Sequence, residues 1–455
     1  MDVILVLPFY ISLYLVIRGK IETAFLWVYL PALLLLPHKY AIHPPQMPPI
    51  SVAQGALIPI GVVALFRLIT RGRPVFLDLL VVMFLIGTGV SEVLRERVMN
   101  TGIFVTTDTV VSILFAYAVG RTLIEPQLRS KTVRRIVLCV LLIGPFGLVE
   151  WRLGQNIYGI VAHRIFAGVE LAPNVQIRSG RGRFSASFDD AEIAGIAIGM
   201  TLALNSWMHF LSKKRPELGI GKWQRRMEKF QVPGILLILY MLATQSRGPL
   251  LAFGAAWMLL QLRKFKHRKT AFLVVAIVLA VGGYVGYLRF LHYTNVATSV
   301  EISNEMQGSA VYRRQMYDLY QPIAEQGGML GWSMLSRPVL PGMFSIDNEY
   351  LLLHIAYGTI GITLFLLIAA ETFRHLIAQL WKRQEEEDLV FTISMLGAMA
   401  VFWLTIYTVY MGEQLPQFAF LLIGWSRSLR PQARSTAVAV EQAEPSKFAF
   451  RRVYQ

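Results

Sequence analysis

Long runs of apolar residues recur along nearly the whole chain and are separated by short polar loops. Many of these runs can cross a hydrocarbon core of about 30 Å as a single helix. The pattern predicts an all-α polytopic membrane protein with about 12 to 13 transmembrane helices. The expected segments are 2–17, 21–37, 52–69, 76–92, 104–124, 136–149, 191–211, 232–245, 249–262, 271–291, 350–370, 390–411 and 415–427.

The apolar segments follow one another without an evident repeat or soluble insertion, so we expect one membrane domain over residues 1–430. Residues 431–455 are polar and rich in small side chains, which predicts a flexible cytoplasmic tail. The first residues, MDVILVLPFY, lack a basic n-region and a cleavage site of the A-x-A kind. We therefore expect a spanning segment there and not a cleaved signal peptide.

Basic loops predict the orientation of the chain. When the sides alternate, the strongly basic loops all fall on one side, together with WKRQEEED (381–388). These loops are RGK (18–20), TRGR (70–73), RSKTVRR (129–135), SKKRPELGIGKWQRRMEK (212–229) and RKFKHRK (263–269). By the positive-inside rule this side is cytoplasmic. The two longer loops, 150–190 and 292–349, are then expected outside.

Composition narrows the classes of function. The formal net charge is +16, but much of the excess lies in the short loops, where it sets orientation and does not indicate nucleic-acid binding. The single cysteine, Cys139, lies inside an apolar segment, which excludes an internal disulfide and a cysteine-based metal site. Walker, HExxH and Ser-His-Asp patterns are absent from the sequence, so we expect no metal and no cofactor.

Arginines gather in the first outer loop, on the side where basic residues should be scarce. They are Arg152, Arg164, Arg178, Arg181 and Arg183, the last three within RSGRGRF (178–184). Arginine offers a planar fork that suits phosphate, and the interleaved glycines let the backbone approach a ligand closely. We expect a phosphate-bearing substrate at the outer face; the alternative is a solvated loop or a contact with lipid headgroups.

Arg247 stands in QSRGP (245–249), which joins two short apolar segments whose far ends are both basic and hence cytoplasmic. Fourteen helical residues rise only about 21 Å, less than the hydrocarbon thickness of about 30 Å. Arg247 is therefore expected below the outer surface, at membrane depth, buried and in need of a partner. Such an arginine is a functional candidate, and the alternative is a side chain that snorkels to the interface.

The second outer loop ends in FSIDNEYLLLHIAYGTIGI (344–362). Asp347 precedes a spanning segment, and His354 follows about two helical turns later, so the two can share a helix face. Asp347 is a functional carboxylate or an N-cap, and His354 is a functional imidazole or a core histidine.

Two further patterns concern local structure. In AVYRRQMYDLYQPI (310–323), Arg313, Tyr317 and Tyr320 recur with a helical rhythm, which predicts an amphipathic helix on the outer membrane surface. In SFDDAEIAG (187–195), Asp189 followed three residues later by Glu192 predicts a capping box for the next segment.

Four stretches in order resemble the O-antigen ligase and polysaccharide polymerase superfamily. RGRFSASFDDAEIAG (181–195) is similar to its R-x-x-G-T-F-G-N-P-N-x-x-A stretch, and SRG (246–248) to its serine-arginine-glycine turn. YRRQMYDLY (312–320) with EQGGMLGWS (325–333) resembles its large periplasmic loop, and DNEYLLLHIAYGTIGI (347–362) its closing segment. The resemblance covers roughly residues 180–370.

The resemblance implies a GT-C-like glycosyltransferase of the bacterial inner membrane, with its active site on the periplasmic side. Its donor would be a glycan on undecaprenyl pyrophosphate, and its acceptor a sugar hydroxyl on a lipid-linked repeat unit or on lipid A-core. Membrane lipids and the proteins of polysaccharide export and chain-length control are further expected partners. Carried over, Arg183 and Arg247 would hold the pyrophosphate, and the substrate-binding residues would be Arg178, Arg181, Arg313, Arg314, Asn348, Tyr317 and Ser246.

The chain departs from the family pattern at two places. Asp347 stands where ligases have histidine, and Asp189, Asp190 and Ala191 replace the N-P-N element. The acidic residue favours a polymerase of a secreted polysaccharide, with a ligase as the alternative and a lipid-linked oligosaccharide flippase as a third possibility. In the expected single displacement at sugar C1, arginines stabilise the leaving pyrophosphate. Asp347 or His354 accepts the proton of the acceptor hydroxyl.

Overall fold

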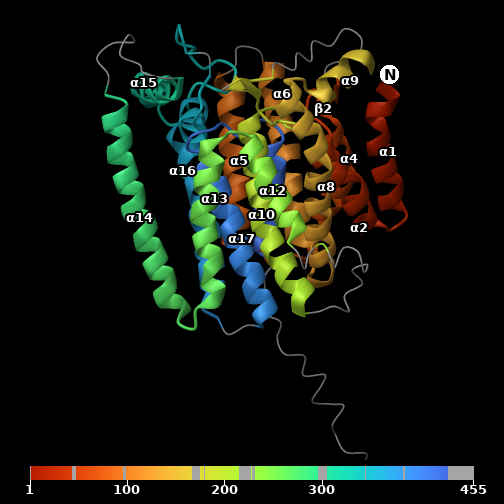
Figure 1. The fold of residues 1–455 in the computed structure, drawn as a ribbon. Helices are drawn as coiled ribbons and strands as arrows, with labels where there is room; N and C mark the ends of the chain where they lie inside the picture. The colour runs from red at the N-terminus through yellow and green to blue at the C-terminus, as the bar shows by residue number, and fades with distance from the viewer. Residues whose placement is uncertain are drawn as a thin grey trace, which may run out of the picture.

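The computed structural model describes residues 2–43, 48–95, 99–165, 175–178, 180–214, 227, 231–295, 305–343, 345–382 and 385–428. Within these residues the chain forms a bundle of helices with two short strand pairs (Figure 1). The expected tail at 431–455 and most of the basic loop at 212–229 lie outside the described residues.

A helix forms at every apolar segment that the sequence predicts. The bundle contains α1 (Asp2–Ile17), α2, η1 and α3 (Ile21–Ala24, Phe25–Tyr29, Leu30–Leu35), α4 (Val52–Arg71), α5 (Phe76–Arg95), α6, η2 and α7 (Met99–Thr109, Val110–Phe115, Ala116–Thr122), α8 (Pro126–Leu153), α10 (Ala191–Lys214), α12 (Val232–Ala243), α13 (Arg247–Leu260), η3 (Gln261–Lys264), α14 (Arg268–Tyr293), α16 (Glu349–Leu380), α17 (Glu386–Thr405) and α18 (Leu415–Ser426). Eight helices of the described chain are long and apolar enough to cross a membrane. The all-α polytopic membrane fold is therefore confirmed.

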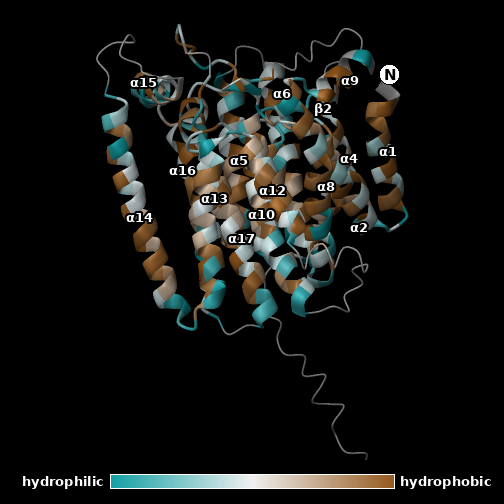
Figure 2. Cartoon of the chain, viewed as in Figure 1, coloured by the Kyte–Doolittle hydropathy of each residue, from teal (hydrophilic) through white to brown (hydrophobic). Residues whose placement is uncertain are grey.

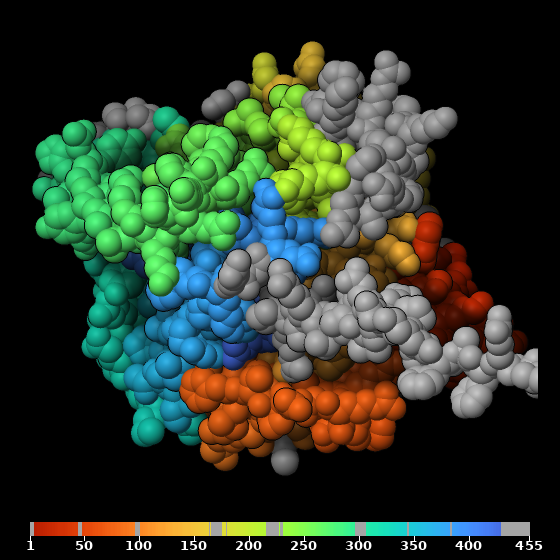
Figure 3. All heavy atoms as spheres, turned by 90° about the horizontal axis from the view of Figure 1, so that it is seen from below, coloured from red at the N-terminus to blue at the C-terminus, as the bar shows by residue number. Residues whose placement is uncertain are grey.

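Burial places two helices at the centre of the bundle and one at its edge. Of the apolar windows of α17 and α10, 89% and 83% is buried, whereas nothing of the window of α14 is buried. Seen from below, the blue C-terminal residues lie between the orange residues of the N-terminal half and the green residues that include α14 (Figure 3). The centre is therefore a packed protein core, and α14 is a peripheral helix.

The outer surface of the bundle is itself apolar, as contact with hydrocarbon requires. Phe66, Leu79 and Ile277 are 66%, 55% and 52% exposed. Figure 2 shows brown, hydrophobic colour along the middle of the helices and teal, hydrophilic colour at the lower helix ends and in the upper connections.

Two more helices lie at one end of the bundle. These are α9 (Ile157–Ile165) and α15 (Glu305–Gln326), which both appear at the upper end in Figure 1, opposite the connection between α13 and α14. Two strand pairs complete the fold, β1 (Ala41–Ile42) with β2 (Ile50–Ser51), and β3 (Ile177–Arg178) with β4 (Arg181–Gly182). Helix α15 is seen end-on in Figure 1, so it runs at a steep angle to the helices of the bundle, and we call it the surface helix. We call this end of the bundle the outer end.

Helix α16 is broken at Gly358, where φ is 63° and ψ is −162°. The glycine-rich segment after α15 enters the break. The amide N–H of Trp332 donates to the carbonyl of Ile355 at 2.9 Å, and the amide N–H of Thr359 donates to the carbonyl of Gly328 at 3.1 Å. These bonds satisfy backbone groups that the break would leave unpaired in the membrane. They also fix the outer part of α16 relative to α15.

Replacing Gly358 by alanine is expected to destabilise the fold by about 3 kcal/mol or more, because overpacking and a positive φ act together. A Cβ there would lie 2.5 Å from the carbonyl oxygen of Gly328 and from the amide nitrogen of Gly331. Both are backbone atoms that cannot yield. The measurement is the thermal unfolding midpoint of the purified protein in detergent. Gly254→Ala is the control, because a Cβ there meets nothing within 4 Å; equal midpoints for both variants would contradict the expectation.

Candidate functional site

Arg183 lies at the centre of the contacts at the outer end of the bundle, and its side chain is only 5% exposed. Its Nε donates to the carbonyl of Thr244 at 3.1 Å, and its Nη2 donates to Oγ of Ser246 at 2.6 Å. A third hydrogen bond reaches the side chain of Gln176. The guanidinium is thus occupied by the protein, and it holds the turn between α12 and α13 in place.

Glu192, near the start of α10, joins two arginines that are distant in sequence. Its Oε1 lies 3.4 Å from Nη2 of Arg183 and 3.4 Å from Nη2 of Arg313 on α15. The Nε atom of Arg313 is buried without a hydrogen-bond partner in the described chain. Glu192 therefore ties the surface helix to the bundle. The sequence pattern predicted a helix-capping role for Glu192 and gave no sign of this bridge.

Arg247 is the first residue of α13, and its side chain is exposed. We expected it to be buried with a partner, and the structure corrects this. Within the described residues its side chain makes no hydrogen bond or ion pair. The connection between α12 and α13 is short, as predicted, and α13 begins below the level of α15 (Figure 1). Of these two arginines, Arg183 is buried and Arg247 is open to a ligand.

Two more predicted arginines flank this turn. Arg178 donates to the carbonyl of Gln245 at 3.0 Å, and it pairs with Arg181 across the β3–β4 hairpin. The exposed Arg181 lies over the ring of Trp151, with 4.6 Å between its Cζ and the ring centroid. The hairpin therefore brings positive charge to the same turn as Arg247. The structure describes the backbone of Arg164 but leaves its predicted role untested.

The other residues predicted on α15 divide into two groups. Arg314 donates to the carbonyl of Leu291 at 3.2 Å and to Oγ1 of Thr294 at 3.2 Å, so it fastens α15 to the end of α14. Tyr317 is 42% exposed and lies within electrostatic range of Tyr407 in the turn after α17. Arg314 thus has a structural role, whereas Tyr317 faces open space near the turn.

Helix caps in the structure lie one residue later than the predicted ones. Asp190, not Asp189, caps α10, because its Oδ1 accepts from the amide N–H of Glu192 at 2.6 Å. Asn348, not Asp347, caps α16, because its Oδ1 accepts from the amide N–H of Leu351 at 3.1 Å. In both loops the carboxylate one residue before the cap, Asp189 or Asp347, therefore does not cap the helix.

Asp189 and Asp347, the two carboxylates that do not cap a helix, lie near Tyr410 in the connection between α17 and α18. Burial raises the pKa of Tyr410 to about 12, and the negative charges of Asp190, Asp189, Glu413 and Asp347 act in the same direction. Burial also raises the pKa of Asp189, which makes no hydrogen bond within the described residues. We call Asp189, Asp347 and Glu413 the acidic cluster. The charge of Asp347 also acts on Glu192, which pairs with Arg183 and Arg313.

Asp347 and His354 are not brought together in the contacts of the described chain. Asp347 accepts a hydrogen bond from Oγ of Ser345, and its amide N–H points to Sδ of Met316 at 3.2 Å. His354 interacts electrostatically with Glu325 at the end of α15, and its buried Nε2 has no hydrogen-bond partner within the described residues. Asp347 is therefore the nearer of the two to the arginines.

His38 and Glu413 form an ion pair at the edge of the acidic cluster, with 2.6 Å between Nδ1 and Oε2. Burial lowers the pKa of His38, but the hydrogen bond and the charge of Glu413 outweigh it, so the pKa of His38 is raised overall. The hydrogen bond from His38 lowers the pKa of Glu413. The pair connects the segment after α3 to the connection between α17 and α18.

We expect this pair to make stability depend on pH. The contribution of His38 is complete below its unfolded pKa of about 6.5 and is lost as the pH rises through its higher folded pKa. The contribution of Glu413 is present above its unfolded pKa of about 4.3 and is lost in more acidic solution. The unfolding midpoint should therefore fall between pH 6 and pH 8 more steeply in the parent protein than in His38→Gln. Parallel curves for the two proteins would show that the pair contributes nothing.

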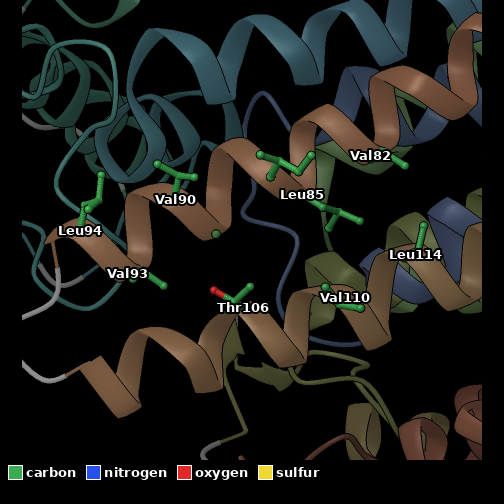
Figure 4. Close-up of a pocket in the computed structure, with 10 residues that line it drawn as sticks. Val82, Leu85, Val90, Val93, Leu94, Thr106, Val110 and Leu114 are labelled. Carbon is green, nitrogen blue, oxygen red and sulfur yellow. The ribbon is translucent and has the colours of Figure 1, made fainter.

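An apolar hollow lies elsewhere in the described chain, between α5 and α6 with η2. Its volume is about 660 Å³, and its lining is apolar apart from Thr106 (Figure 4). Val93 of α5 lies opposite Thr106 of α6 across it (Figure 4). No charged side chain lines this hollow, so it fits hydrocarbon and offers nothing to a phosphate.

No family model matches this chain, and no curated protein matches it significantly. Among the described residues, no group of three or more His, Cys, Asp or Glu side chains is arranged to hold a metal ion. The chemistry of the outer end must therefore be inferred from its arginines and carboxylates.

Proposed function

We propose that this protein is a GT-C-like membrane glycosyltransferase that transfers a glycan from undecaprenyl pyrophosphate to an acceptor sugar hydroxyl. We place it in the bacterial inner membrane, with the reaction at the periplasmic face, and we favour polymerisation of a secreted polysaccharide. The observation that carries the proposal is the position of Arg247. It is an exposed arginine at the N-terminus of α13, beside a hairpin that carries Arg178 and Arg181.

The surroundings of Arg247 suit a diphosphate. The N-terminus of α13 adds the partial positive charge of the helix dipole and free backbone N–H groups. Arg183 keeps this helix end in place through Ser246, and Arg313 is held nearby by Glu192. Charge-assisted hydrogen bonds to phosphate are about twice as strong as neutral ones. A lipid-linked diphosphate is an anion that can reach this depth of the membrane without leaving the bilayer.

The proposed reaction is a single displacement at the anomeric carbon of the donor sugar. The acceptor hydroxyl oxygen forms a bond to C1 as the bond from C1 to the pyrophosphate oxygen breaks. Arg247 stabilises the charge that develops on the leaving pyrophosphate. Asp347 accepts the proton of the acceptor hydroxyl, and it lies near enough to Glu192 to belong to the same site.

Two other functions remain to be distinguished by experiment. A ligase would use the same donor with lipid A-core as its acceptor. A flippase would move the donor across the membrane without forming a glycosidic bond. The charged groups of the described site gather at the outer end of the bundle, and this favours a transferase over a flippase.

Reconstitution into vesicles with a purified lipid-linked repeat unit tests the proposal. Longer glycans on the lipid indicate a polymerase. Transfer that requires added lipid A-core indicates a ligase. Movement of the donor between leaflets without a new glycosidic bond contradicts the proposed transferase.

The orientation is tested separately with a cysteine in place of the exposed Arg152 at the end of α8. We expect it to react with an impermeant maleimide applied to cells with a permeabilised outer membrane. The native Cys139 is buried and should give little background. Reaction only after lysis of the inner membrane would place the outer end in the cytoplasm and overturn the proposed topology.

A further inference from the structure

One face of α13 is exposed along most of its length and is apolar except at its outer end. Leu250, Leu251 and Trp257 are 38%, 76% and 55% exposed, and Gly254 is open, since a Cβ there meets nothing within 4 Å. Arg247 is exposed at the top of this face. The other side of α13 packs against α10 and α17. We call these five residues the α13 stripe.

Helix α14 follows α13 in the chain, but its side chains do not become buried against the bundle. None of its residues is buried, whereas each of the other seven candidate spans buries between 39% and 89% of its apolar window. Residues 280–289, almost three turns, are all exposed. Helix α14 stands at the edge of the molecule beside α13 (Figure 1). The space around its outer half is therefore open to molecules from the bilayer.

The outer ends of these elements converge. A Cβ on Gly248 would lie 2.7 Å from Oγ1 of Thr408, so the start of α13 touches the turn after α17. Tyr407 in that turn is within electrostatic range of Tyr287 on α14 and of Tyr317 on α15. The top of the α13 stripe is thus bordered by α14, by the surface helix and by exposed tyrosines, whose rings and hydroxyls suit an interface between hydrocarbon and water.

We propose that the α13 stripe docks the hydrocarbon chain of a lipid diphosphate that enters sideways from the bilayer beside α14. The diphosphate then lies at Arg247, and the first part of the chain lies along Leu250, Leu251 and Gly254. From Arg247 to Trp257 the helix rises about 15 Å, which is half the hydrocarbon thickness of about 30 Å. A cation above an apolar stripe matches an anionic head on a long apolar chain. This inference rests on the proposed function, because it assigns the lipid portion of the same donor.

The hollow between α5 and α6 serves as an internal control for the α13 stripe. It is also apolar, but no charged side chain lines it (Figure 4). Any membrane lipid can fill it without regard to the headgroup. Selectivity for a diphosphate should therefore distinguish the α13 stripe from a merely apolar face.

The test is photo-crosslinking in the full-length protein, reconstituted in nanodiscs. A benzophenone amino acid replaces Gly254 in one variant, Leu251 in a second and Val90, in the α5–α6 hollow, in a third. Each variant is irradiated with undecaprenyl diphosphate or with undecaprenol, and the adducts are measured by mass spectrometry. At positions 254 and 251 we expect at least about tenfold more adduct with the diphosphate, since charge-assisted contacts select it. Adding Arg247→Gln should abolish this preference, and position 90 should show none.

Equal labelling of positions 254 and 251 by both lipids, or a diphosphate preference only at position 90, would overturn the proposal. The outcome is separable from that of the proposed function. Selective crosslinking without glycan transfer would support the docking stripe and count against the enzyme. If glycan transfer occurs without selective crosslinking, and if Gly254→Phe transfers glycan as fast as the parent, the enzyme is supported and docking at the α13 stripe is contradicted.

Discussion

Arg247→Gln is expected to lower the rate of glycan transfer at least about a hundredfold, which corresponds to about 2.7 kcal/mol of lost transition-state stabilisation. The exposed guanidinium at the start of α13 has no partner within the described chain, so its charge is available to the pyrophosphate. Arg247→Lys should retain part of the activity, because it keeps the charge but loses the planar fork. The measurement is the initial rate with saturating and with subsaturating donor in the reconstituted assay.

Arg71→Gln is the matched control. It removes the same charge from an exposed arginine at the end of α4, in a loop that is expected on the opposite, cytoplasmic side. It should leave the rate within about twofold, since exposed charges far from a site contribute little. Equal rates for Arg247→Gln and the parent, at equal amounts of folded protein, would exclude phosphate contact at this position. Unchanged activity in Arg247→Lys alone would mean that the charge suffices and that the fork is unused.

The fold was predictable from the sequence because the membrane imposes a strong pattern. Each backbone polar group in hydrocarbon must be satisfied within the segment, so long apolar runs become helices. The expected segment at 350–370 nevertheless missed the break at Gly358. Hydropathy indicates only that such a segment is apolar. The hydrogen bonds that make the break possible come from the backbone of residues 327–333, which lie outside the segment.

The sequence predicted which residues make up the candidate site but not which of them form hydrogen bonds and ion pairs with one another. The sequence indicated which arginines gather at the outer end, yet it assigned burial to Arg247, and the structure buries Arg183. The difference depends on Glu192 and on the carbonyl of Thr244, which reach Arg183 only after α10 and α12 have packed together. Spacing along the chain carries no record of such contacts.

The same limit explains the acidic residues. A capping pattern specifies a short polar side chain near a helix start, and either of two adjacent residues can meet that requirement. Asp190 and Asn348 act as the caps, so Asp189 and Asp347 do not cap these helices. Only the structure, therefore, separates the capping residues from the carboxylates that are free for chemistry.

Asp347→Asn is expected to lower the rate of transfer at least about a hundredfold if its carboxylate is the general base, and Asp347→His should restore part of the activity. Because Asn348 is the cap of α16, this loss cannot be attributed to a lost helix cap. His354→Ala is the comparison, and it should reduce the rate less, since the contacts of His354 lie toward Glu325. The rates are measured from pH 5 to pH 8 with purified lipid-linked repeats.

Asp189 provides the sharpest alternative to Asp347. Burial raises the pKa of Asp189, which makes its carboxylate a stronger base than an ordinary aspartate. The electrostatics favour Asp347, since its charge acts on Glu192, which pairs with both Arg183 and Arg313. Asp189→Asn is accordingly expected to lower the rate by less than about tenfold. A larger loss in Asp189→Asn than in Asp347→Asn would transfer the role of base to Asp189 and leave Asp347 to orient the acceptor.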